Sequence, residues 1–304
     1  QLTVSLPPDL IPVPGTATDP ATGLPLFARS RQTGLVFRFI PGGPCAMGSP
    51  QGALADEDEQ PRHNVVLSPY FFAVAPIENA LYEQQFAPEH RQKRGAYSKQ
   101  PAQPAARVTY HQATAFARWL CEQEGAPADS YRLPTEAQFE RATRGAYPNA
   151  SYLYPNGDEP DPGYDVYSQP SAIAVDVGPT NSFGLYHTVA NIFQWTSDWY
   201  ADKYDDCPCA ATNPKGPATG KQRVLRGGTW YVYAMSFRAA DRFKSTPDTE
   251  EDHIGLRVVR KLDAVQSVAM SAATTTTPAT GDTSPGSPTS DDIAAITNNF
   301  CIEK

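Results

Sequence analysis

The stretch from residue 226 to residue 242, RGGTWYVYAMSFRAADR, concentrates side chains that could form a functional site. Its one serine, Ser236, would need a neighbouring base to act as a nucleophile. The stretch contains no histidine and no cysteine, and the five histidines of the chain are isolated from one another. Neither a Ser-His-Asp nor a Cys-His arrangement is therefore expected. Arg238, Asp241 and Arg242 are interpreted as structural ion-pair residues within an aromatic frame.

The five cysteines do not show the spacing of a metal site. The Cys207-Pro208-Cys209 sequence lacks the CxxC spacing of zinc ribbons, and no second pair completes four ligands. We interpret Cys121, in an expected helix, as a buried thiol. A disulfide from Cys207 or Cys209 to a distant cysteine stays an open alternative, and the sequence does not assign its partner.

Composition excludes several classes of function. The chain has 304 residues, 40% of them hydrophobic, and a formal net charge of −8, so a nucleic acid or an anionic membrane is not an expected partner. No stretch approaches the roughly 20 apolar residues that span a bilayer.

The sequence starts at Gln1, which we interpret as a start left by signal-peptide removal, and this predicts an extracellular or cell-surface protein. The acidic run Asp56–Glu59 is interpreted as a solvated loop.

The elements that must position residues 226–242 belong to a β-rich body. This body begins at TGLVFRFIPGG, residues 33–43. Two helices are expected over Thr109–Glu124 and Thr135–Arg144, since each starts with a threonine and carries a glutamine three residues later, as in a capping box. Residues 146–225 are mostly loop, and so long a loop needs bound cations or an aromatic network to hold it.

The two ends of the chain differ from the body. Residues 1–32 are predicted to be an extended Pro-rich arm, and residues 263–304 a Thr/Ser/Pro-rich linker with a short apolar end. Neither can bury enough apolar area to order by itself. We therefore expect contacts between copies, forming a homo-oligomer or filament through the arms. The residues expected to make them are Leu2, Val4, Leu6, Ile296, Phe300, Cys301 and Ile302.

Six pieces of the sequence resemble, in order and spacing, the formylglycine-generating enzyme (sulfatase-modifying factor) family. They are FRFIPGGPCAMGSP, DEDEQPRHNVVLSPYFFAVAPIENALYEQQF, RLPTEAQFERATRG, FGLYHTVANIFQWTSDWY, NPKGPATGKQRVLRGGTW and STPDTEEDHIGLRVVR. The resemblance covers one domain, residues 33–262. It implies an α+β fold, the family's variant of the C-type-lectin fold, with little regular secondary structure.

The family's oxidase activity uses two cysteines that bind copper, and the resemblance places their positions at Val232 and Phe237. Tyr233 replaces the histidine that often follows the first cysteine. Cu(I) prefers soft thiolate ligands, which valine and phenylalanine do not supply. We therefore expect no copper and favour a protein without this activity, while the sequence leaves other enzymatic chemistry open.

Calcium is the structural ion that the resemblance implies. One site would use backbone carbonyls and a glutamate in the segment VANIFQW, where Asn191 and Gln194 are the candidates. An amide oxygen is a weaker ligand for calcium than a carboxylate. A second site maps to Asp165 and Val166, with Asp176 as a further acidic ligand.

We expect a non-catalytic, extracytoplasmic member of the family that acts as a self-assembling structural protein or as a binding protein. A peptide or glycan ligand would be contacted by the residues around the lost copper site. These are Thr229, Trp230, Tyr231, Tyr233, Phe237 and Arg238. The alternative is an oxidase or maturation enzyme that acts on a peptide or a peptide-derived metabolite.

Overall fold

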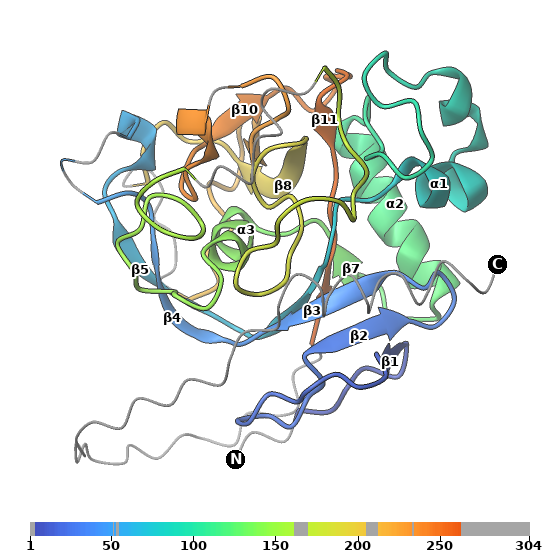
Figure 1. The fold of residues 1–304 in the computed structure, drawn as a ribbon, viewed down its shortest axis with the longest axis horizontal. Helices are drawn as coiled ribbons and strands as arrows, with labels where there is room; N and C mark the ends of the chain where they lie inside the picture. Colours follow the sequence, from blue (N-terminus) through green and yellow to red (C-terminus); the bar gives the residue numbers. More distant parts are fainter. Residues whose placement is uncertain are drawn as a thin grey trace.

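The computed structural model describes residues 4–262 apart from residues 51, 53–54, 161–169, 205–211 and 233. Its strands form three sheets that surround a short central helix, α3 (Figure 1). The strands are β1 (Leu10–Pro12), β2 (Phe27–Ser30), β3 (Val36–Ile40), β4 (Gly43–Met47), β5 (His63–Leu67), β6 (Tyr70–Ala73), β7 (Tyr131–Arg132), β8 (Phe193–Trp199), β9 (Arg223–Arg226), β10 (Phe243–Ser245), β11 (Ile254–Gly255) and β12 (Val259–Lys261). The α-helices are α1 (Asn79–Leu81), α2 (Tyr110–Gln123) and α3 (Glu136–Thr143). Single turns of other helix types cover Glu57–Glu59, Tyr82–Phe86, Pro88–Gln92 and Ala234–Phe237.

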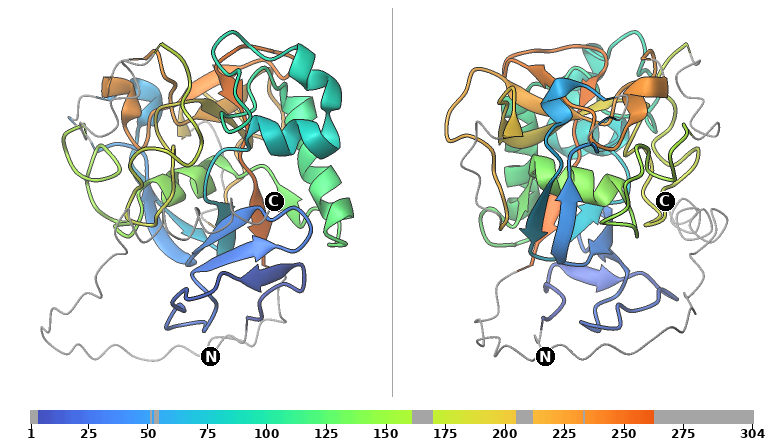
Figure 2. Two further views of the ribbon diagram at one scale, coloured as in Figure 1. Left: turned by 45° about the vertical axis from the view of Figure 1, so that its right-hand side comes forward. Right: turned by 90° about the vertical axis from the view of Figure 1, so that its left-hand side faces the viewer.

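The largest sheet has six strands in the order β1-β2-β3-β6-β12-β7, and each neighbouring pair is antiparallel. A second sheet has the order β10-β9-β8-β11, with β11 parallel to β8, and β4 pairs with β5 alone. Strands β1 to β3 lie at one end of the molecule and β10 toward the opposite end (Figures 1 and 2). The residues of interest therefore lie at the end away from the N-terminal strands.

The prediction of an extended N-terminal arm over residues 1–32 is wrong for the described part of that range. Strand β1 pairs with β2, and β2 pairs with β3, so this segment forms the edge of the large sheet. Its apolar residues are buried in the core, among them Leu10, Val13, Leu24 and Phe27. Proline is compatible with this position because an edge strand leaves some of its N–H groups unpaired.

The structure also bears on the residues that were expected to contact another copy of the chain. Val4 and Leu6 pack against the core of their own chain, so they do not offer a free apolar surface to another copy. Leu2 and the C-terminal residues Ile296, Phe300, Cys301 and Ile302 lie outside the described residues.

Both predicted helices are confirmed. The hydroxyl of Thr109 accepts a hydrogen bond from the N–H of Gln112, and the side chain of Gln112 accepts from the N–H of Thr109. Thr135 and Gln138 form the same reciprocal pair at the start of α3. Each box satisfies two backbone donors that a helix start would otherwise leave unpaired.

Helix α3 is buried along its whole length, including its charged residues. It packs against β4 and β5 and also against β8 and β9. A charged helix can occupy the middle of a domain only when its charges are paired. No helix among the described residues has the length and apolar content needed to cross a membrane.

Candidate functional site

The RGG sequence forms a tight turn that directs the chain away from β9. Gly227 and Gly228 have φ of 98° and 69°, a region that favours glycine. A Cβ atom on Gly228 would lie 3.1 Å from the ring of Phe237, and one on Gly227 would lie 3.1 Å from Nε2 of Gln194. After the turn, the N–H of Trp230 donates to the carbonyl of Asn191 at 3.2 Å. The turn thus joins the 226–242 stretch to the segment before β8.

The two positions of the family's copper ligands adjoin one apolar cluster and carry no ligand atoms. Phe237 is 2% exposed, and Val232 packs against the same apolar cluster as Phe237. The two cysteines in the described residues lie in other clusters, Cys121 in the largest and Cys45 beside α3. Burial raises the pKa of the Cys45 thiol to about 11, which disfavours its thiolate. These residues do not fit a copper ion.

Arg238 and Asp241 form an ion pair, but the main partner of Arg238 is Glu59. Nη2 of Arg238 lies 2.5 Å from Glu59, 2.9 Å from Asp56 and 3.3 Å from Asp241. The interpretation of the acidic run as a solvated loop holds for the exposed Asp56 and Glu57 but is wrong for Glu59, which is fully buried. These three carboxylates lie close enough to bind a metal ion, yet the guanidinium already supplies the cation. Burial, together with neighbouring Glu59 and Asp56, raises the pKa of Asp241 to about 8.

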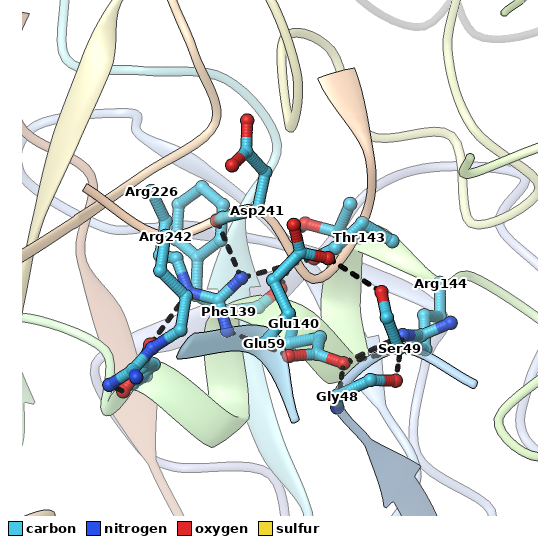
Figure 3. Close-up of polar contacts among 12 residues, drawn as sticks. Gly48, Ser49, Glu59, Phe139, Glu140, Thr143, Arg144, Arg226, Asp241 and Arg242 are labelled. Atoms are coloured by element: carbon cyan, nitrogen blue, oxygen red, sulfur yellow. Dashed lines mark hydrogen bonds and ion pairs between the residues drawn. The ribbon is translucent and has the colours of Figure 1, made fainter. Parts of the chain in front are cut away.

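A second network of buried charges fixes the start of the 226–242 stretch on α3 (Figure 3). Nε of Arg226 lies 3.0 Å from Glu136, and its Nη2 lies 2.7 Å from Glu140. Arg242 binds Glu136 at 2.6 Å, and Arg144 binds Glu140 at 2.8 Å. The arginines beside Glu140 lower the pKa of its carboxyl despite full burial. This geometry confirms the structural interpretation of Arg242.

The candidate calcium ligands Asn191 and Gln194 are engaged in other contacts. The side chain of Asn191 pairs with the N–H and carbonyl of Ile173. Nε2 of Gln194 donates to the carbonyls of His187 and Ile192 at 2.8 and 3.2 Å. A carboxylate at this position would turn acceptors toward those carbonyls and require a cation between them, whereas the amide supplies donors.

The guanidinium group of Arg257 contacts Gln194 and the neighbouring carbonyl groups. Nε of Arg257 donates to Oε1 of Gln194 at 2.6 Å, and its other nitrogens donate to the carbonyls of Ala73, Tyr186 and His187. Arg257 is fully buried, and burial lowers its pKa well below the usual value. The residues at Asn191 and Gln194 therefore do not fit calcium as they stand.

The second predicted calcium site stays a prediction. Asp165 and Val166 lie outside the described residues. Asp176 is half-buried in the loop that precedes β8.

Aromatic side chains form a partly exposed strip beside the lost copper site. The ring of Trp230 lies 4.5 Å from that of Tyr97 and 5.1 Å from that of Tyr231, and Tyr231 lies 5.0 Å from His253. Tyr97 is 41% exposed and Tyr231 is 48% exposed. Nε1 of Trp230 is buried and has no hydrogen-bond partner among the described residues. We refer to Tyr97, Trp230, Tyr231 and His253 as the aromatic strip.

The structure separates the predicted ligand-contacting residues into two groups. Trp230 and Tyr231 belong to the aromatic strip, while Thr229, Phe237 and Arg238 are buried and hold the segment in place. Tyr233 lies outside the described residues. Tyr97 and His253 were not predicted, because both are far from residue 230 in the sequence and no local motif marks them.

The family model for the sulfatase-modifying factor enzyme 1-like domain matches residues 26–262. The serine/threonine-protein kinase pkn1 of Chlamydia pneumoniae is 30% identical over 250 residues, which is 74% of this chain but 38% of the kinase. The formylglycine-generating enzyme of Streptomyces coelicolor is 28% identical over 318 residues, covering 83% of this chain and 96% of the enzyme.

Among solved structures, PvdO from Pseudomonas aeruginosa superposes with a TM-score of 0.66 at 21% sequence identity. The match covers 81% of this chain and all of PvdO. At this identity the likeness concerns the fold alone, and it confirms the predicted variant of the C-type-lectin fold.

Proposed function

Because the chain belongs to the family of sulfatase-modifying factor enzyme 1-like domains, we propose that it is a member that binds a ligand through the aromatic strip and does not perform the family's copper chemistry. The observation that carries the proposal is that Phe237 belongs to an apolar cluster against which Val232 and Trp230, a residue of the strip, both pack. Two hydrocarbon side chains occupy the positions of the copper ligands, so the thiolate chemistry has no basis there.

The strip has the properties of a binding surface. Half-exposed aromatic rings bury large area on contact and lose little conformational entropy, so they anchor peptides and sugars alike. Carboxylates lie beside the rings: Glu251 is 3.3 Å from His253, and Asp252 pairs with Arg107 at 3.1 Å. Such carboxylates can accept hydrogen bonds from sugar hydroxyls or from a basic peptide.

The self-assembling alternative has less support than binding. Val4 and Leu6, two of the residues expected to contact a neighbouring copy, pack against their own core. The extracellular location expected from the sequence is part of the proposal, and it suits a protein that meets glycans or peptides outside the cell.

The test compares binding to a glycan array and a peptide array by three proteins. Tyr231→Ala should lower the signal of the wild-type ligands at least tenfold, because it removes the most exposed ring of the strip. Tyr147→Ala is the matched control, since Tyr147 is 51% exposed but packs against Tyr152 elsewhere. Equal losses in both variants, or no loss in Tyr231→Ala, would exclude the strip as the binding surface.

A further inference from the structure

A cavity of about 230 Å³ lies on a different part of the molecule from the aromatic strip. It is bounded by the start of α3, the end of β8 and the loop around Gly216. Its charged and polar lining residues are His63, Glu136, Asp198, Lys203, Tyr204 and Arg242, and the indole of Trp199 supplies an apolar wall. A space of this size holds several water molecules or one small organic molecule.

Asp198 is the buried carboxyl of this cavity that lacks a direct ion pair. The charges of Arg132 and Arg223 act on it from a longer distance. Asp198 is 3% exposed, and it forms no ion pair with any described residue. Its Oδ2 accepts hydrogen bonds from the N–H of Glu136 at 2.9 Å and the hydroxyl of Ser197 at 3.0 Å. The hydrogen bonds found for this carboxyl in the described chain all fall on Oδ2, which leaves Oδ1 for a ligand.

The other charges of the cavity are already matched. Arg242 donates to both oxygens of Glu136 and to the carbonyls of Asp58 and Ala201. Lys203 is exposed, so it is solvated by water. Residues 205–211, DDCPCAA, contain no lysine, arginine or histidine that could supply a cation.

A buried carboxyl without a direct ion pair favours either protonation or a cationic ligand. Burial, together with neighbouring Glu136, raises the pKa of Asp198 to about 7, and the more distant Arg132 offsets this only in part. An anionic ligand would find only the exposed Lys203, because the donors of Arg242 are engaged.

We propose that this cavity binds a small organic molecule that carries a primary ammonium group, with Asp198 as its counter-ion and Trp199 against its carbon chain. The ammonium group would supply the direct ion pair that Asp198 lacks. This proposal is independent of the aromatic strip, with which the cavity shares no residue.

The probe is n-butylamine, and n-butanol is its neutral counterpart of the same size. Binding is measured on protein labelled with ¹³C at the aspartate carboxyls, by the saturable shift of the Asp198 resonance at pH 7.5. The wild-type protein should bind butylamine at least tenfold more tightly than butanol. Asp198→Asn should lose this preference, while it keeps an oxygen that accepts from the N–H of Glu136 and so preserves the start of α3.

The matched control is Asp202→Asn, which removes a carboxyl that is 82% exposed and pairs with Lys244 outside the cavity lining. This variant should bind butylamine with the affinity of the wild type. Its binding is measured by the shift of the Asp198 resonance, as for the wild type. Thermal unfolding establishes that all three proteins are folded. The proposal is overturned if folded wild type does not bind butylamine, if butanol binds equally well, or if Asp198→Asn binds butylamine with unchanged affinity, measured for that variant by calorimetry.

Discussion

Replacing Arg226 by methionine should destabilise the protein more than any exposed charge substitution. Its guanidinium donates to Glu136 at 3.0 Å, to Glu140 at 2.7 Å and to the carbonyls of Ala239 and Asp241 at 3.2 and 2.9 Å. Methionine keeps the length of the side chain but leaves two buried carboxylates with fewer cations. Breaking a buried ion pair in this way costs about 3–5 kcal/mol.

The assay is thermal and urea unfolding of the wild type and the variant at pH 7. For a domain of this size each kcal/mol corresponds to roughly 2–4 °C, so the loss in melting temperature should be about 10 °C. Lys244→Met is the control: Lys244 is 41% exposed and lies 3.2 Å from Asp202, and loss of such a pair costs about 0–1 kcal/mol. If Arg226→Met unfolds within about 1 kcal/mol of the wild type, the network does not anchor the 226–242 stretch as described.

Two further substitutions test a buried amide, Gln194, and a buried carboxyl, Asp241. Gln194→Glu should make thermal stability depend on calcium, because a carboxylate would face the carbonyls of His187 and Ile192. The prediction is contradicted if calcium raises the melting temperature of the variant no more than that of the wild type. Asp241→Asn should gain stability over the wild type as pH rises. The folded pKa of Asp241 is about 8, above its unfolded value near 3.8, so its favourable contribution is complete below pH 4 and is lost as pH rises toward 8. Urea unfolding of both proteins at pH 5 and pH 8 measures the difference, and an unchanged difference would refute the assignment.

The sequence predicted the local features of this fold well. Each helix start carries its own capping residues, Thr109 with Gln112 and Thr135 with Gln138, so three or four neighbouring residues contain the whole signal. The loss of the copper ligands is likewise readable at Val232 and Phe237, once the family resemblance fixes the positions.

Long-range partners could not be predicted in the same way. Glu59 looked like part of a solvated acidic run, because its partner Arg238 follows 179 residues later. The aromatic strip joins Tyr97, Trp230 and His253 from three separate segments. The edge position of β1, which makes its prolines acceptable, also depends on a sheet that forms only in the folded chain.

The measurement that tests the central claim most directly is a formylglycine assay with copper. The reduced protein is incubated with Cu(I), oxygen and a cysteine-containing peptide, and the peptide is analysed by mass spectrometry. The double variant Val232→Cys with Phe237→Cys is included, and it should bind Cu(I) because it restores thiolates at two positions that adjoin one apolar cluster. We predict that the wild type converts no more peptide than copper alone. Conversion by the wild type above that background would contradict the account, since it would require a copper site other than the one that Val232 and Phe237 have replaced.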